Sequence, residues 1–192
     1  MSNEVELKFL VTEDVFSHLE LVLNSLKVTE RQDQQLENIY FDTPEQALRG
    51  LDCGLRIRSF RGLHEQTIKM AGQAIGGLHQ RPEYTLPCND NWPDLHAFPA
   101  SIWPADTNVG LLQQSLMTLF QTNFHRRTWK VALADDSLIE VAYDIGFIDA
   151  NGQQEAINEV ELEIIAGSVE HLFALAKLLV TRPGWQLGCA SK

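Results

Sequence analysis

Charged side chains recur at every second position in several short segments of this 192-residue sequence. The first segment reads Glu4-Val5-Glu6-Leu7-Lys8, and later segments read Arg56-Ile57-Arg58 and Glu159-Val160-Glu161-Leu162-Glu163. Alternate residues of a β-strand point to opposite faces, so each segment predicts a strand with one charged and one apolar face. The charged residues that share a face in this way are Glu4, Glu6, Lys8, Arg56, Arg58, Lys69, Arg81, Glu83, Arg126, Lys130, Glu140, Asp144, Glu159, Glu161 and Glu163.

These charges are sorted by sign along the chain. Carboxylates concentrate on the first and last strand-like segments, whereas Arg and Lys concentrate on the middle ones. Carboxylate oxygens suit hard cations such as Mg²⁺ or Mn²⁺, and guanidinium and ammonium groups suit phosphate oxygens. The two sets of ligands together predict a site for a triphosphate with a divalent metal.

Two arrangements of the strands fit the alternation. In one, the charges form the solvated exterior of the protein, which is the commonest arrangement for any single strand. In the other, the charges line a water-filled tunnel and the apolar faces pack against helices. The sorting by sign favours the tunnel, because a merely solvated surface has no reason to separate acids from bases. The helices also need an apolar sheet face to pack on.

The elements that position these residues are eight predicted strands. Turn signals separate several of them, including Arg61-Gly62, the glycine-rich stretch 72–77 and Asn151-Gly152. The strands are expected at about residues 3–11, 34–42, 53–60, 64–71, 79–87, 123–133, 137–148 and 155–165.

Apolar residues at helical spacing predict helices over about 15–27 and 168–181, and residues 88–120 are expected to form a loop with one or two helices. No structure is expected after Pro183-Gly184. Eight strands in mostly hairpin order can close on themselves and so remove exposed sheet edges. We therefore expect an α+β fold, an eight-stranded antiparallel β-barrel with packing helices outside it.

Composition sets further bounds on function. The length is typical of one domain, expected to span residues 1–192. The net charge of -11 excludes nucleic-acid binding through the overall field, so an anion site requires a local concentration of Arg and Lys. Cys53, Cys88 and Cys189 show neither disulfide nor zinc spacing. The N-terminal sequence and the lack of a long apolar stretch predict a cytoplasmic protein without membrane contact.

The ordered charges resemble those of the CYTH superfamily, the triphosphate tunnel metalloenzymes. Glu4-Val5-Glu6-Leu7-Lys8 matches the E-x-E-x-K signature of that family, and the other charged pairs follow in its strand order over essentially the whole chain. Residues 39–44, 48–50, 54–58 and 76–84 are similar to the bacterial inorganic triphosphatases. Many of those enzymes carry a C-terminal helical CHAD domain, which the resemblance therefore implies as a possible domain of a longer protein.

The resemblance implies a role for each matching position. The implied metal ligands are Glu4, Glu6, Asp144, Glu159, Glu161 and Glu163, and the implied phosphate-binding residues are Lys8, Arg56, Arg58, Lys69, Arg126 and Lys192. Lys8, Glu83 and Lys192 are the implied catalytic residues. Two alternatives stay open. The E-x-E pair of the last strand is Glu159 with Glu161 or Glu161 with Glu163, and the second pair suits the distance to the following helix better; the arginine is Arg126 or Arg127.

The activity implied by the resemblance is metal-dependent hydrolysis of inorganic triphosphate to diphosphate and phosphate, with Mg²⁺ or Mn²⁺ as cofactor. Alternatives are a class IV adenylyl cyclase, a thiamine triphosphatase-like activity and a polyphosphate-binding module without catalysis. The retained carboxylates argue against the last of these, because without metal they would repel an anion. The expected partner is a small-molecule triphosphate.

Overall fold

A computed structural model describes residues 2–12, 14–133 and 136–188 of the chain. The strands are β1 (Ser2–Val11), β2 (Lys27–Asp42), β3 (Gly54–Phe60), β4 (Leu63–Lys69), β5 (Gln73–Ile75), β6 (Leu78–Cys88), β7 (Met117–Ala132), β8 (Leu138–Ala150), β9 (Gln153–Ala166) and β10 (Trp185–Leu187). The helices are α1 (Phe16–Leu23), α2 (Ala47–Gly50), α3 (Val109–Ser115) and α4 (Val169–Leu179), with short 3₁₀ turns at Leu95–Ala97 and Ala100–Ile102. Among the described residues, none of these helices is long and apolar enough to cross a bilayer.

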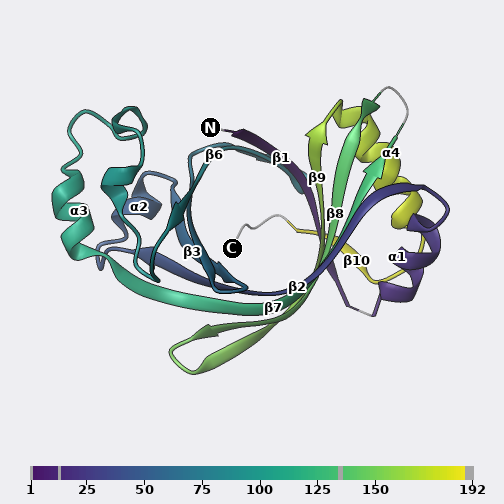
Figure 1. The fold of residues 1–192 in the computed structure, drawn as a ribbon, viewed down its shortest axis with the longest axis horizontal. Coiled ribbons are helices and arrows are strands. Elements are labelled where there is room, and N and C mark those ends of the chain that lie inside the picture. Colours follow the sequence, from purple (N-terminus) through teal and green to yellow (C-terminus); the bar gives the residue numbers. More distant parts are fainter. Residues whose placement is uncertain (1, 13, 134–135, 189–192) are drawn as a thin grey trace.

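The strands close into a barrel (Figure 1). They follow the order β1-β9-β8-β7-β2-β3-β4-β6, and antiparallel pairing of β6 with β1 completes the ring. Two of the ten strands in the sheet, β5 and β10, lie outside this ring as short additions to β6 and β1, which leaves eight. The predicted eight-stranded antiparallel barrel with helices outside is confirmed.

Some of the predicted boundaries were wrong. β2 begins at Lys27 and β7 at Met117, because the two strands pair with each other along almost their whole length. The apolar residues before position 120 therefore belong partly to a strand rather than to a helix. β5 and β10 were also missed, since each is only three residues long and depends on a neighbouring strand for its hydrogen bonds.

Two of the predicted tight turns are confirmed by backbone geometry. Arg61 and Gly62 have φ of 50° and 77°, and Asn151 and Gly152 have φ of 54° and 79°. Two successive residues with positive φ form the turn whose twist suits a two-residue β-hairpin. These turns join β3 to β4 and β8 to β9, so the local sequence sets the register of both hairpins.

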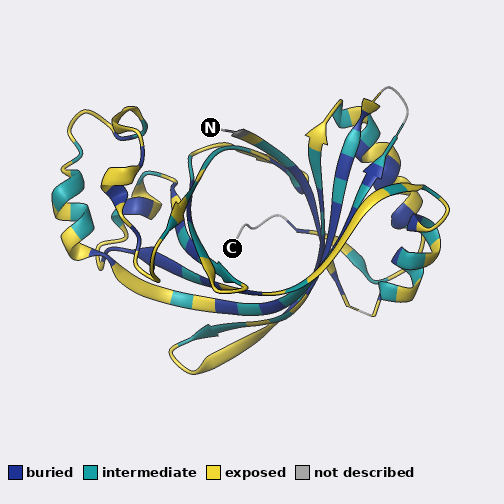
Figure 2. Cartoon of the chain, in the orientation of Figure 1, coloured by how far each residue is buried: buried dark blue, intermediate teal, exposed yellow. Residues whose placement is uncertain are grey.

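The apolar faces of the strands point out of the barrel. On one side, Val141, Val160 and Leu162 pack against Leu19 of α1 and Leu175 of α4. On the other side, the outer faces of β2, β3 and β4 pack against α2 and the segment that contains the 3₁₀ turns. Figure 2 shows the buried residues where α1 and α4 meet the sheet. With the apolar faces covered by helices, the charged faces line the inside.

Candidate functional site

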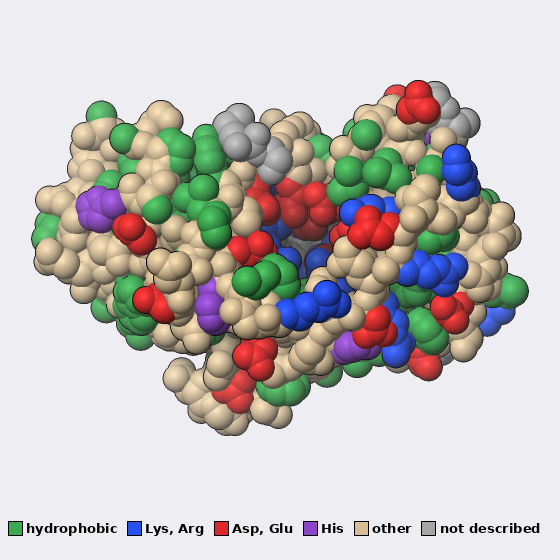
Figure 3. Space-filling view, viewed as in Figure 1, with side chains coloured by type: hydrophobic (Ala, Val, Ile, Leu, Met, Phe, Trp, Pro, Cys, Tyr) green, Lys and Arg blue, Asp and Glu red, His purple; other side chains and the backbone are tan. Residues whose placement is uncertain are grey.

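A cavity of about 190 Å³ lies inside the barrel. Figure 3 shows it as a hollow in which acidic side chains gather on one side and basic side chains on the other. The residues that line it are Glu4, Glu6, Lys8, Asn38, Tyr40, Gly54, Arg56, Arg58, Thr67, Lys69, Arg81, Glu83, Phe124, Arg126, Glu140, Ala142, Glu161 and Glu163. Most of this lining is charged, which distinguishes the cavity from an apolar core.

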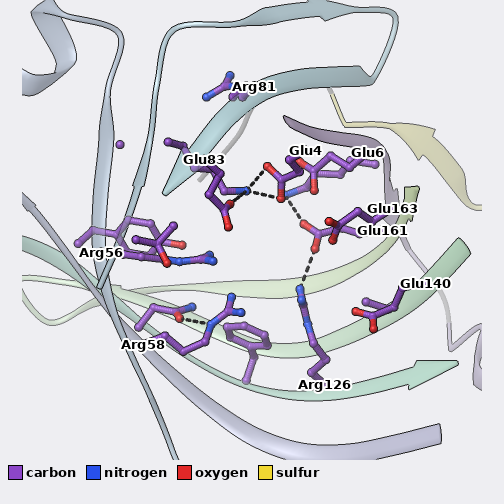
Figure 4. A pocket seen from close by; sticks show the side chains of 18 residues that line it. Glu4, Glu6, Arg56, Arg58, Arg81, Glu83, Arg126, Glu140, Glu161 and Glu163 are labelled. Carbon is purple, nitrogen blue, oxygen red and sulfur yellow. Dashed lines mark hydrogen bonds and ion pairs between the residues drawn. The ribbon is translucent and has the colours of Figure 1, made fainter. Parts of the chain in front are cut away.

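Five carboxylates form what we call the acidic wall: Glu4 and Glu6 of β1, Glu140 of β8, and Glu161 and Glu163 of β9. Strand register brings them together, because Glu163 lies opposite Glu6 on one side and opposite Glu140 on the other. Directly opposed residues of antiparallel strands share a face and lie within side-chain contact. The wall is therefore assembled from three adjacent strands (Figure 4).

Three arginines form what we call the basic wall: Arg56 and Arg58 of β3 and Arg126 of β7. Figure 4 shows them across the cavity from the carboxylates of β1 and β9. Arg58 Nε donates a hydrogen bond of 3.0 Å to Asn38 Oδ1. Arg56 Nε is buried and makes no hydrogen bond within the described part of the chain. The basic wall can therefore donate to an anion in the cavity.

Lys69 of β4 connects the acidic wall to Glu83 of β6. Its Nζ lies 2.5 Å and 2.7 Å from the two carboxylate oxygens of Glu4, and 3.5 Å from Oε2 of Glu83. Glu83 lies opposite Lys69 in the β4–β6 pair, so the lysine has one partner in the neighbouring strand and a second partner one strand further on. This places a positive charge at the edge of the acidic wall.

A second group of ion pairs lies deeper in the barrel. Arg126 donates to both carboxylate oxygens of Asp144 at 2.7 Å and 2.6 Å and to Glu161 at 2.7 Å. Lys8 Nζ lies 2.7 Å from Oε2 of Glu159 and 3.6 Å from Oε1 of Glu161. Glu161 therefore contacts both cations, and one of its oxygens lies within 4.8 Å of oxygens of Asp144 and Glu159.

Two carboxyls of the acidic wall are poorly compensated by positive charge. Burial and then repulsion by Glu161 raise the pKa of Glu6 to about 8, against the opposing effect of Lys69. Burial and then repulsion by Glu4 and Glu140 raise the pKa of Glu163 to about 7. A bound cation would relieve this repulsion, and carboxylate oxygens are the ligands that hard divalent cations prefer. The acidic wall thus fits a divalent metal.

Two cationic side chains of the cavity also have shifted pKa values, in opposite directions. Burial alone would lower the pKa of Lys8, but Glu161 and Glu159 outweigh it, so this pKa is raised. For Arg58, burial and then repulsion by Arg56 and Arg126 lower the pKa to about 9. Arg58 remains charged at neutral pH, and an anion bound beside these arginines would offset their mutual repulsion.

The family of this chain follows from its sequence as a whole. The family model described as CYTH domain matches residues 2–183. The chain belongs to the CYTH family. The match covers every strand of the barrel and every residue that lines the cavity.

A curated relative of this CYTH domain is an inorganic triphosphatase of Haemophilus influenzae, which is 33% identical over 192 residues. The alignment covers 100% of this chain and 53% of the relative, so the chain spans about half the length of that protein.

Solved structures share the fold of the CYTH domain. A protein from Hippeastrum, described as a putative adenylyl cyclase with a dominant triphosphatase activity, superposes with a TM-score of 0.67 at 17% identity, covering 98% of this chain and 92% of that one. The triphosphatase of the Mimivirus capping enzyme superposes with a TM-score of 0.54 at 12% identity, covering 92% and 89%.

The CYTH domain brings most of the sequence-predicted site residues into one cavity. Those that line it are Glu4, Glu6, Lys8, Arg56, Arg58, Lys69, Glu83, Arg126, Glu161 and Glu163. Asp144 and Glu159 are buried and do not line this cavity; Glu159 borders a second hollow together with Lys8. Lys192 lies outside the described residues. Arg126 faces the cavity, whereas Arg127 lies on the other face, where its guanidinium stacks on Phe16 and contacts Asp33.

Sequence reasoning left eight lining residues out of the predicted site. They are Asn38, Tyr40, Gly54, Thr67, Arg81, Phe124, Glu140 and Ala142. Arg81 and Glu140 could have been included, because they have the same alternation as the other charges. Asn38 and Tyr40 are uncharged and gave no such signal. They were found only because β2 lies beside β3, where Asn38 is opposite Arg58 and Tyr40 is opposite Arg56.

Proposed function

We propose that the cavity binds an inorganic triphosphate together with a divalent metal, Mg²⁺ or Mn²⁺, and hydrolyses it to diphosphate and phosphate. The observation that carries this proposal is the opposition of the acidic and basic walls across one cavity inside a barrel of the CYTH family. A cavity with only arginines would suit an anion alone, and a cavity with only carboxylates would suit a cation alone. The two walls together suit a metal–polyphosphate complex.

Different residues of the chain would bind the phosphates, add positive charge and orient the attacking water. Arg56, Arg58 and Arg126 would hold the phosphate oxygens and stabilise the charge that develops on the non-bridging and leaving oxygens during in-line attack by water. Lys8 and Lys69 would add charge at the border between the walls. A carboxylate of the cavity would orient the attacking water. Glu83 is the one carboxylate among the catalytic residues that the family resemblance implies, which also include Lys8 and Lys192.

Glu4, Glu6, Glu161 and Glu163 would hold the metal, because they are carboxylates of the acidic wall and two of them have raised pKa values. A divalent cation held there would neutralise the acidic wall and withdraw charge from the phosphate oxygens. The choice of Mg²⁺ or Mn²⁺ follows from the all-oxygen ligand set.

The inorganic triphosphatase of Haemophilus influenzae supports this assignment of substrate, and the triphosphatases among the similar structures agree with it. The proposal also includes a cytoplasmic location, one tunnel domain over residues 1–192, and a CHAD domain in a longer protein. It includes no nucleic-acid or membrane partner.

The test is a comparison of substrates. Inorganic triphosphate, ATP and thiamine triphosphate are each incubated with the chain and Mg²⁺ or Mn²⁺, and released phosphate and cyclic AMP are measured. We expect metal-dependent phosphate release, fastest with inorganic triphosphate. Cyclic AMP as the main product would instead identify a cyclase, and tight binding without turnover would identify a polyphosphate-binding module.

The matched variants are Glu4→Gln with Glu6→Gln inside the cavity and Glu20→Gln on α1 outside the barrel. The rate of phosphate release by the double variant should fall by roughly 100-fold or more, while its circular dichroism spectrum should stay the same. Glu20→Gln should retain the wild-type rate. Full activity of the double variant would overturn the proposed site.

A further inference from the structure

Asp144 of β8 and Glu159 of β9 are the most deeply buried carboxylates of the charged face. They lie directly opposite each other in the β8–β9 pair, and they are 0% and 3% exposed. Neither lines the cavity, although both have the same alternation as residues that do. Two adjacent buried carboxylates would repel each other strongly without positive partners.

Each of these carboxylates is bound to one cation that does line the cavity. Asp144 accepts hydrogen bonds from Arg126 Nε and Nη2 at 2.7 Å and 2.6 Å, which is the two-pronged geometry that fixes the plane of a guanidinium. Glu159 lies 2.7 Å from Lys8 Nζ, and both of these side chains are about 5% exposed or less. The carboxylates therefore lie behind the two cations, as seen from the cavity.

We propose that Asp144 and Glu159 are positioning residues, which hold Arg126 and Lys8 in place for the triphosphate, and that neither of them binds the metal. This inference rests on the proposed function of the cavity. A metal among the oxygens of Asp144, Glu159 and Glu161 would lie beside the positive charges of Arg126 and Lys8, which already occupy these carboxylates. Long basic side chains lose much rotamer freedom when they bind a ligand, and buried counter-ions remove that cost in advance.

The same geometry separates the three glutamates of β9. Glu161 also contacts Lys8 and Arg126, but it lines the cavity, and so does Glu163. Glu159 contacts Lys8 Nζ but does not line the cavity. Of the two E-x-E pairs left open by the sequence, the inference therefore assigns the metal to Glu161 with Glu163 and leaves Glu159 to position Lys8.

The test separates metal binding from catalysis by measuring both. Asp144→Asn and Glu159→Gln keep the size of each side chain and remove its charge. Titration calorimetry with Mn²⁺ alone should give dissociation constants within about 3-fold of the wild type, whereas the kcat/KM for inorganic triphosphate should fall by roughly 10- to 100-fold. Glu6→Gln, which changes the acidic wall itself, should weaken Mn²⁺ binding strongly.

A control for general damage is Asp42→Asn. Asp42 is also a buried carboxylate, 4% exposed, but it lies outside the cavity and accepts hydrogen bonds from the backbone of Leu48 and Arg49 in α2. This variant should lower the unfolding temperature and leave kcat/KM within about 2-fold. If Asp144→Asn does not fold, Glu159→Gln still carries the test.

Two results would overturn the inference. One is a loss of Mn²⁺ affinity in Asp144→Asn or Glu159→Gln as large as in Glu6→Gln, which would make these residues metal ligands. The other is an unchanged kcat/KM in both variants. If the wild type hydrolyses no triphosphate, the proposed function fails separately, and the same variants are then compared by their affinity for inorganic triphosphate, where a weaker binding supports positioning and an equal binding opposes it.

Discussion

Lys69 Nζ lies 2.5 Å from a carboxylate oxygen of Glu4, although the two residues are 65 positions apart in the chain. They belong to β4 and β1, which are separated by β6 in the barrel. The contact exists only because β1 and β6 pair and close the ring. It brings a basic residue from the middle of the sequence to the acidic residues at its beginning, which is the arrangement on which the proposed site depends.

Replacing Lys69 should weaken substrate binding. Lys69→Met removes a positive charge from the cavity and leaves Glu4 and Glu83 facing the phosphates, so the KM for inorganic triphosphate should rise by about 10-fold or more. Steady-state kinetics at saturating metal measures this effect. Lys177→Met on the outer helix α4 is the control and should leave KM unchanged. Equal KM values in the two variants would contradict a role of Lys69 in binding.

Arg126 and Arg127 should differ sharply in their importance. Arg126→Lys replaces a guanidinium that donates to both Asp144 and Glu161. The single ammonium group of a lysine cannot reproduce this two-pronged geometry, so kcat/KM should fall by roughly 100-fold. Arg127→Lys changes a residue on the outer face and should keep kcat/KM within about 2-fold. The opposite ranking would show that the wrong arginine has been placed in the cavity.

Metal binding should strengthen as the pH rises. Without metal, Glu6 and Glu163 have pKa values of about 8 and 7, so both are largely protonated at pH 6. A metal must displace these protons, and its affinity should rise by about tenfold for each pH unit per displaced proton, up to pH 8. Calorimetry with Mn²⁺ in buffers of different ionisation enthalpy measures both affinity and released protons. Equal affinity at pH 6 and pH 8.5 would contradict the assignment.

Glu6 should destabilise the metal-free protein at high pH. Its folded pKa of about 8 lies above the ordinary value of 4.5, so the folded state binds the proton more tightly than the unfolded state. The resulting stabilisation is complete below pH 4.5 and is lost as the pH rises through 8. Metal-free Glu6→Gln, which is always neutral, should therefore unfold a few degrees above the wild type at pH 8.5, where about 1 kcal/mol corresponds to about 2–4 °C.

At pH 4 the unfolding temperatures of metal-free Glu6→Gln and wild type should be nearly equal, because Glu6 is then largely protonated in both the folded and the unfolded state. At pH 8.5, added Mn²⁺ should raise the unfolding temperature of the wild type and have little effect on Glu6→Gln. A difference in unfolding temperature that does not depend on pH would show that packing, and not the charge of Glu6, separates the two proteins.

Gly146 should tolerate no larger residue. A Cβ atom there would lie 2.1 Å from the backbone oxygen of Asn123 and 2.5 Å from Phe124, which lines the cavity. Gly146→Ala should therefore destabilise the fold by about 1–3 kcal/mol or more in chemical denaturation. Gly50→Ala is the control, since nothing lies within 4 Å of its added Cβ. Similar stabilities of the two variants would show that β7 and β8 separate easily at this point.

Much of the fold could be predicted because short stretches of the sequence specify strands and turns by themselves. The alternation around Glu4, Arg56 and Glu161 follows from the two-residue repeat of a strand, and Asn151-Gly152 specifies a hairpin through its own backbone preferences. β5 and β10 could not be predicted in this way. Their hydrogen bonds come from β6 and β1, so no property of three isolated residues indicates them.

The sequence alone determined which side chains share a charged face, because that depends only on their spacing along each strand. The tertiary structure decided which of them reach the cavity. Asp144 and Glu161 both belong to the charged face, yet Asp144 is covered by Arg126 while Glu161 is open to the cavity. The physical reason is that depth within a barrel depends on the register between strands and on the size of the side chains in front, and both are set by contacts between distant parts of the chain.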